Sequence, residues 1–314
     1  MRTVRSEYEQ TVREVHDVLS SAEGRDRLLA RREHAKTMAD GLHRWEQLKS
    51  GRIRRRGAVL TVTQAALENA FTGPGVLRVS VEVNGVGVGK LVFSTKRGPL
   101  FTSTEDPQKK LEWSGNARDG EVINAYIEQR RSSKSMPERE VQGNMSARFR
   151  ALFDDAQRPP GGLVPVRPVG CMMEIPTAVA ASKKLKVGGG AIDILARTGR
   201  GRTGWFIACE LKKPKATDHP RDVLRQAIRY ATALDVEVNG RGLLPPADAA
   251  VYRELFGGSG SAALRFGALA AISVPQRDEL TDAFVALAPP PGIWLGALIY
   301  KQERSRLSAV LERP

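Results

Sequence analysis

The sequence predicts an α/β protein with a mixed sheet in its C-terminal part, and three observations lead to this prediction. A helical pattern runs from residue 137 to about 154 with its apolar side chains on one face. A linker rich in proline and glycine and then three strand-like runs follow it. A second helical pattern then precedes two more strand-like runs, the first of which completes a predicted α-β-β-β-α-β core.

The individual elements of this region are identified by their hydrophobic periodicity. The apolar face of the first helix carries Val141, Met145, Phe149 and Leu152. The elements that follow are three strands, one helix and two strands, at about 170–180, 189–198, 203–212, 221–234, 266–274 and 293–301. We assign residues 133–314 to this α/β domain, because Ser132 and Ser133 open a polar break just before it.

The N-terminal third divides into two further regions. Residues 1–56 carry leucines and alanines at helical spacing among many charges, with a break from Ser20 to Gly24, which predicts a helical hairpin. Its charged faces either pair with a second copy of the chain, giving a homo-oligomer, or are simply solvated. The basic cluster at 52–56 either contacts phosphates or forms a solvated linker.

Residues 57–132 form the second of these regions, which we expect to contain a small β-structure. Alternating apolar residues stand on both sides of Asn84-Gly85, the dipeptide best suited to a type I′ turn. A β-hairpin is therefore predicted there, and a helix is predicted from Asp119 to Arg130.

The charge and composition of the chain indicate its class of partner. The formal net charge is +14 with a pI near 10.1, which attracts polyanions, and nucleic acid is the polyanion we expect; the alternative is that the charge serves solubility. No secretion signal opens the sequence, and three prolines at 289–291 interrupt its longest apolar stretch, so we expect a cytoplasmic protein without a membrane span. The two cysteines and four histidines show no metal-ligand spacing, so oxygen ligands are expected for any metal.

Three polar residues in the predicted strands carry the candidate chemistry. The period of two in WFIACELKK puts Glu210 and Lys212 side by side on one face of their strand. Asp193 interrupts an otherwise apolar strand, where a carboxylate is costly unless it is paired or binds a cation. If the two strands form a hairpin around the turn at 199–202, Asp193 comes opposite the Glu210 region.

This grouping suits the hydrolysis of phosphodiesters. Asp193 and Glu210 can hold Mg²⁺, which polarises the scissile phosphate and lowers the pKa of a bound water. Lys212 would orient or activate that water and stabilise negative charge. The alternative is an ordinary salt bridge between strand residues.

The same residues resemble the split signature of the PD-(D/E)xK nuclease superfamily, which implies a restriction-endonuclease-like fold. Ile192-Asp193 and Glu210-Leu211-Lys212 carry the resemblance, and Ile192 stands where the family has proline. Gln226 and Tyr230, four residues apart on one helix face, resemble the Gln-x-x-x-Tyr element of the RecB-like branch. In that family these two residues support the active site and approach the substrate backbone.

The resemblance also implies an acidic residue on the first core helix. Glu138 and Glu140 are the candidates, and Glu140 is preferred because a capping box with Ser135 is sufficient reason for Glu138. Glu174, on the first strand, is a further possible ligand, although a surface acid is the simpler interpretation. Lysines that would bind phosphates without reading bases lie near the motif at 183, 184, 186, 213 and 215.

Taken together, the resemblance implies a Mg²⁺-dependent nuclease in which Mn²⁺ can substitute. DNA is the expected substrate ahead of RNA, and a role in bacterial antiviral defence or DNA processing is the expected context. The alternative is a non-catalytic nucleic-acid-binding or assembly protein that retains the nuclease fold. Metal dependence distinguishes the two, because the binding protein needs no metal.

Overall fold

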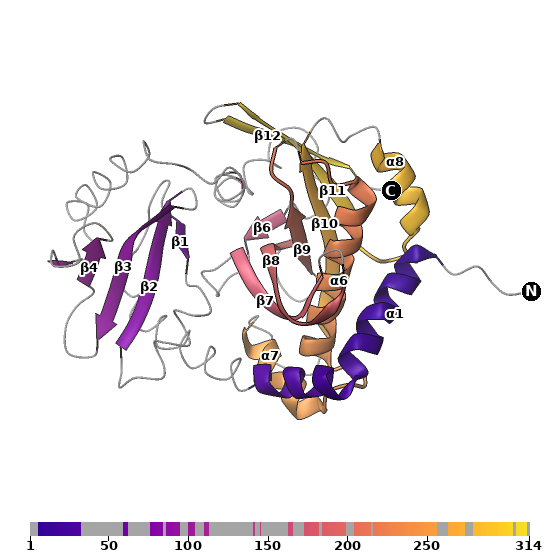
Figure 1. The fold of residues 1–314 in the computed structure, drawn as a ribbon, viewed down its shortest axis with the longest axis horizontal. Helices are drawn as coiled ribbons and strands as arrows, with labels where there is room; N and C mark the ends of the chain where they lie inside the picture. The colour runs from indigo at the N-terminus through magenta and orange to yellow at the C-terminus, as the bar shows by residue number, and fades with distance from the viewer. Residues whose placement is uncertain are drawn as a thin grey trace, which may run out of the picture.

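We describe the fold from a computed structural model of the chain. The described residues are 6–32, 59–61, 76–83, 86–94, 100–103, 110–112, 141, 145, 163–165, 173–181, 184–198, 204–214, 216–255, 263–273, 279–303 and 306–312. The protein is of the mixed α/β type, with one seven-stranded and one five-stranded sheet (Figure 1).

The larger sheet has the strand order β12-β11-β10-β9-β8-β6, and β7 pairs with β8 outside this path. Its strands are β6 Leu163–Pro165, β7 Met173–Ala180, β8 Lys186–Thr198, β9 Trp205–Leu211, β10 Arg265–Ser273, β11 Leu295–Glu303 and β12 Arg306–Glu312. Strands β9, β10 and β11 are parallel, whereas β6, β7 and β9 each pair antiparallel with β8 and β12 pairs antiparallel with β11. The sheet is therefore mixed, as the sequence predicts.

The central strands β9 and β10 are apolar and buried along almost their whole length, because both faces of the sheet are covered. Phe206 and Ala208 belong to a core that includes the buried face of helix α6, Pro220–Asn239. Ile207 and Cys209 belong to a second core on the opposite face. The predicted first core helix contributes its Val141 and Met145 to this second core, both in helical conformation; the rest of its span lies outside the described residues.

Helix α6 begins and ends at residues suited to those positions. His219 is the N-cap and accepts a hydrogen bond from the Arg221 backbone N–H, with Pro220 in the first turn. Gly240 follows the last turn at a φ of 77°, a conformation that costs glycine little. The helix is longer than the predicted span of 221–234, because Val236 and Val238 continue its buried face.

Four elements of the C-terminal part were not predicted. They are the helices α7 Pro246–Leu255 and α8 Leu280–Leu287 and the strands β6 and β12. The two helices are short, and α8 lies within a stretch of mostly apolar residues, where periodicity does not separate a helix from a strand.

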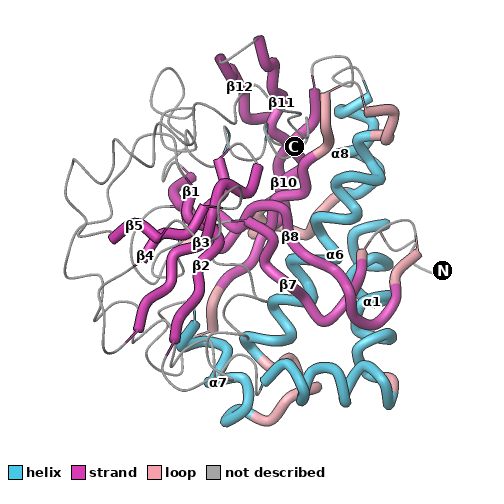
Figure 2. The backbone as a smooth tube through the Cα atoms, turned by 60° about the vertical axis from the view of Figure 1, so that its left-hand side comes forward, coloured by secondary structure: helices cyan, strands magenta, loops and turns pink. Residues whose placement is uncertain are grey.

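The N-terminal helices pack on the α/β domain. Helix α1, Glu7–Ser20, starts at the N-cap Ser6 and ends at a bend at Ser21, after which residues 22–32 are helical, so the predicted break is confirmed. The helices meet at this one-residue bend and diverge, whereas a helical hairpin needs a longer loop (Figure 2). Val15, Leu19 and Leu28 are fully buried in the core that α6 covers. Residues 6–32 therefore share the core of the C-terminal domain.

The five-stranded sheet is antiparallel and has the order β1-β2-β3-β4-β5. Its strands are β1 Val59–Thr61, β2 Val76–Val83, β3 Val86–Ser94, β4 Leu100–Ser103 and β5 Lys110–Glu112. Val83 pairs with Val86, so Asn84-Gly85 joins β2 and β3 directly and the predicted hairpin is confirmed. The predicted helix at 119–130, the basic cluster at 52–56 and the domain boundary near 132 lie outside the described residues.

Among the helices that the structure describes, none has the length and apolar character needed to cross a membrane.

Candidate active site

The pairing of β8 with β9 brings Asp193 and Glu210 together. Ile194 pairs with Cys209, and one further step of this antiparallel register sets Asp193 opposite Glu210. The Oδ2 atom of Asp193 accepts a hydrogen bond of 2.7 Å from the Leu211 backbone N–H. The strand register therefore places Asp193 opposite the Glu210 region, which is the position that the sequence predicts.

Glu210 and Lys212 occupy the same side of the sheet, as their alternation predicts. Glu210 is 4% exposed, and its Oε1 lies 2.9 Å from the Nζ of Lys212. Two hydrogen bonds to the backbone of Lys212 hold this end of β9. The Lys212 N–H donates to the Ala271 carbonyl at 3.0 Å, and the hydroxyl of Tyr300 donates to the Lys212 carbonyl.

Helix α6 adds the two residues of the predicted Gln-x-x-x-Tyr element. The Oε1 atom of Gln226 accepts a hydrogen bond of 3.2 Å from the Nζ of Lys212. Tyr230 is buried, and burial and then the charge of Glu210 raise its pKa, against hydrogen bonds with the Ala181 backbone and the Gln226 side chain. The structure therefore joins Asp193, Glu210, Lys212, Gln226 and Tyr230 into one polar cluster.

The charge state of Lys212 follows from opposing effects. Burial by itself lowers the pKa of this ammonium group, but Glu210 and, more weakly, Asp218 and Asp193 raise it, and the net direction is upward. Lys212 is therefore a cation throughout the neutral range. Burial raises the pKa of the Cys209 thiol well above its usual value, as do Asp193 and Glu210, so Cys209 stays protonated.

Sequence reasoning missed two residues of this site, Tyr300 and Asp218. Tyr300 ends the apolar run of β11, two strands away from β9, and nothing in its own sequence indicates the Lys212 carbonyl as its partner. Asp218 lies in the segment that precedes α6 and acts on Lys212 through its charge. Neither residue belongs to a recognisable motif.

The other residues that the sequence proposes for the site fall into two groups, those outside the described residues and those that the structure describes. Glu138, Glu140, Lys183 and Lys215 lie outside the described residues, whereas Lys184, Lys186 and Lys213 are exposed. Glu174 lies in β7 between the pairs Met173–Ile194 and Ile175–Ile192, so its backbone position is opposite Asp193. The row of acidic positions across β7, β8 and β9 is therefore 174, 193 and 210.

The donor set at the cluster suits a hard divalent cation. Carboxylate oxygens are the ligands that Mg²⁺ and Ca²⁺ prefer, and Asp193 and Glu210 present them from adjacent strands. In the described part of the chain, no three His, Cys, Asp or Glu side chains gather closely enough to hold an ion. Asp193 and Glu210 are therefore the residues that would hold such a cation.

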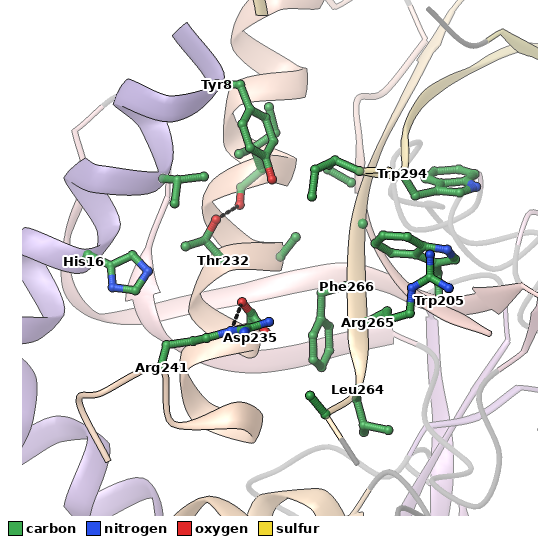
Figure 3. Close-up of a pocket in the computed structure, with 17 residues that line it drawn as sticks. Tyr8, His16, Trp205, Thr232, Asp235, Arg241, Leu264, Arg265, Phe266 and Trp294 are labelled. Atoms are coloured by element: carbon green, nitrogen blue, oxygen red, sulfur yellow. Dashed lines mark hydrogen bonds and ion pairs between the residues drawn. The ribbon is translucent and has the colours of Figure 1, made fainter. Parts of the chain in front are cut away.

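A separate cavity of about 210 Å³ lies between α1, α6 and the first residues of β9 and β10 (Figure 3). Tyr8, Trp205 and Phe266 are among its lining residues. Its Asp235 contacts Arg241 at 2.7 Å, and its Thr232 donates to the Ile228 carbonyl at 2.8 Å. Because Trp205 begins β9 and Glu210 lies near the end of β9, the cavity is distinct from the polar cluster.

No protein-family model, curated protein or solved structure matches this chain. The function must therefore be argued from the geometry and chemistry of the polar cluster.

Proposed function

We propose that the protein is a metal-dependent nuclease of the PD-(D/E)xK type that hydrolyses phosphodiester bonds, with DNA as the expected substrate. The observation that carries this proposal is the convergence of Asp193, Glu210 and Lys212. Asp193 lies in β8, and it is opposite Glu210, which lies with Lys212 at the end of the adjacent strand β9. An ordinary salt bridge between Glu210 and Lys212 would need neither Asp193 opposite Glu210 nor Gln226 on the Lys212 ammonium.

The chain order also supports a restriction-endonuclease-like core. Strands β7, β8 and β9 precede α6, and β10 then returns parallel to β9. Glu210 and Lys212 lie at the end of β9, where Gln226 of α6 contacts the Lys212 ammonium. Antiviral defence or DNA processing is the biological setting that we propose for this activity.

In this mechanism Asp193 and Glu210 would hold the metal from adjacent strands. When bound, Mg²⁺ supplies positive charge at the scissile phosphate and lowers the pKa of a water. Lys212 presents a permanent ammonium to the developing negative charge, because its raised pKa makes it a poor base. Gln226 holds the Nζ of Lys212 in place from α6, and Tyr230 in turn contacts the Gln226 side chain through a hydrogen bond.

The proposal is tested by cleavage of labelled single-stranded DNA, duplex DNA and RNA with Mg²⁺, Mn²⁺ or EDTA. We expect cleavage with either metal and none with EDTA. Asp193→Asn and Lys212→Ala should each lower the rate by about a hundredfold or more, because each removes a charge that acts on the transition state. Asp17→Asn and Arg25→Ala, exposed positions on the N-terminal helices, are the matched controls.

Cleavage that persists at full rate in Asp193→Asn would contradict the proposed site. Binding of nucleic acid by the wild type without any cleavage, and without a need for metal, would instead identify a non-catalytic binding protein that retains the nuclease fold. The choice among the three substrates decides between DNA and RNA.

A further inference from the structure

Three arginines form a row along helix α6, which also carries Gln226 and Tyr230 of the proposed active site. Arg221, Arg225 and Arg229 are spaced by four residues, so they lie on one side of the helix about 6 Å apart along its axis. Each of the last two is followed directly by a residue of the polar cluster, Gln226 or Tyr230. The arginine row therefore lies on the same helix as two residues of the polar cluster, on the side that α1 covers.

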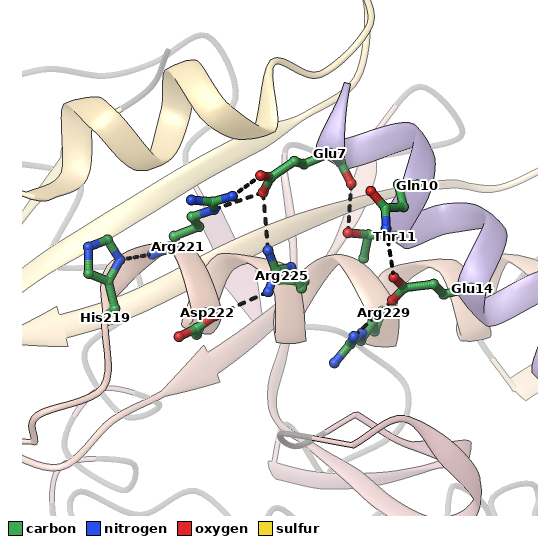
Figure 4. A network of polar contacts seen from close by, with 9 residues as sticks. All are labelled: Glu7, Gln10, Thr11, Glu14, His219, Arg221, Asp222, Arg225 and Arg229. Carbon is green, nitrogen blue, oxygen red and sulfur yellow. Dashed lines mark hydrogen bonds and ion pairs between the residues drawn. The ribbon is translucent and has the colours of Figure 1, made fainter. Parts of the chain in front are cut away.

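Carboxylates of α1 contact all three arginines (Figure 4). Glu7 contacts Arg221, with 2.8 Å from the arginine Nε to Oε2, and it also contacts Arg225 at 3.1 Å. Glu14 lies 2.8 Å from Arg229. Each carboxylate thus pairs with the guanidinium groups as a phosphate would, because both anions accept hydrogen bonds from the planar guanidinium group of arginine.

The charge of α1 is unusual for this protein. The chain as a whole carries a net charge of +14, yet α1 contains four acidic residues and one arginine. Two of the acids, Glu9 and Asp17, are exposed and take no part in the arginine contacts, whereas Glu7 and Glu14 stand two helical turns apart and face α6.

The attachment of α1 does not depend on these ion pairs. Val15 and Leu19 are fully buried against the core, and Tyr8, Val12 and Val18 pack beside them. The side chains of Arg221, Arg225, Glu7 and Glu14 keep contact with solvent, at 41%, 29%, 27% and 38% exposed, whereas Arg229 is 12% exposed. The two pairs that Glu7 makes with Arg221 and Arg225 therefore contribute little to stability, so a competing anion can replace them while α1 stays in place.

We propose that Arg221, Arg225 and Arg229 form a binding row for the phosphate backbone of nucleic acid, and that Glu7 and Glu14 of α1 occupy this row as internal competitors. The identity of the partner rests on the proposed function. The physical consequence is a weakened, more selective binding of substrate, because nucleic acid must displace two carboxylates to use the row.

The test is a titration of fluorescent single-stranded and duplex DNA, followed by anisotropy in EDTA at several salt concentrations. We expect Glu7→Gln/Glu14→Gln to bind about tenfold more tightly than Glu9→Gln/Asp17→Asn, which changes the charge of the same helix equally. The plot of log Kd against log salt should steepen by about two to three for duplex DNA, because each arginine that becomes available displaces counterions.

A second set of variants ties this gain to the arginine row. Adding Arg225→Gln and Arg229→Gln to Glu7→Gln/Glu14→Gln should abolish the tighter binding, with circular dichroism and thermal unfolding confirming that each variant is folded. Equal affinities of the two double variants, or a gain that survives loss of the arginines, would overturn the proposal.

This experiment is independent of catalysis. Because EDTA prevents any metal-dependent cleavage, tighter binding of Glu7→Gln/Glu14→Gln supports the row even if the cleavage assay fails. Conversely, a nuclease whose activity needs Asp193 but whose Glu7→Gln/Glu14→Gln variant binds no better than its control would keep the proposed function and lose the row.

Discussion

At the scale of single residues, the backbone of Lys212 is held as firmly as its side chain. Its carbonyl accepts from Tyr300 and its N–H donates to Ala271, while its Nζ contacts Glu210 and Gln226. The position of the ammonium group therefore depends on three elements, β10, β11 and α6. A change that loosens the backbone should misplace the charge without removing it.

Replacing Tyr300 by phenylalanine tests this dependence. Tyr300→Phe removes one buried hydrogen bond, which should lower the free energy of unfolding by about 1 to 3 kcal/mol, and it should also lower the cleavage rate. Tyr252→Phe is the matched control, because Tyr252 is also a buried residue and its hydroxyl donates to the Leu28 carbonyl at 2.8 Å. Equal cleavage rates in the two variants, measured beside denaturant unfolding, would argue against a positioning role for Tyr300.

Tyr8 in the separate cavity predicts an alkaline limit to stability. Burial and the nearby charge of Asp235 raise its pKa to about 12, from a usual value near 10. Its contribution is therefore complete below pH 10 and is lost as pH rises toward 12, because the unfolded state releases the proton first. Urea unfolding at pH 9 and pH 11 should show a smaller loss in Tyr8→Phe than in wild type, by about 1 to 2 kcal/mol. Equal losses would rule out this contribution.

At the scale of elements, Glu237 of α6 joins three parts of the fold. Its Oε1 lies 2.8 Å from the Nε of Arg31, in the helical segment 22–32, and accepts from the Ala178 backbone N–H of β7 at 2.7 Å. Both side chains of this ion pair are buried. The N-terminal helical segment, the sheet and α6 therefore meet at one charged group that the core cannot leave unpaired.

Removing one partner of this pair should be far more damaging than removing both. Glu237→Gln should lower the free energy of unfolding by about 3 to 5 kcal/mol, because it leaves Arg31 buried without its counterion. The double variant Arg31→Met/Glu237→Met should recover much of that loss. The exposed pair of Arg241 with Asp235 provides the comparison, and Arg241→Met should cost less than about 1 kcal/mol. A double variant as unstable as Glu237→Gln would contradict this argument.

At the scale of the whole molecule, metal binding and folding are coupled if Asp193 and Glu210 hold an ion. A ligand that binds only the folded state stabilises it by about 2.7 kcal/mol at a hundred times its Kd. We therefore expect Mg²⁺ to raise Tm by several degrees relative to EDTA. The shift should vanish in Asp193→Asn/Glu210→Gln and persist in Asp17→Asn. A shift of the same size in both variants would mean that the ion binds elsewhere.

The sequence by itself determines the elements and faces that build the candidate site. Alternation along β9 places Glu210 and Lys212 on one face, the antiparallel pairing of β8 with β9 brings Asp193 opposite Glu210, and helical spacing sets Gln226 and Tyr230 one turn apart. These features are predictable because the direction of a side chain in a strand or helix follows from its local backbone.

Only the tertiary structure decided which residues distant in the sequence contact the site and helix α6. Tyr300 on the Lys212 carbonyl, Arg31 on Glu237 and the α1 carboxylates on the α6 arginines each join residues 88 or more positions apart. No local pattern specifies such partners, because they depend on how helices and strands pack after their faces are set. The same packing brought residues 6–32 into the core of the C-terminal domain.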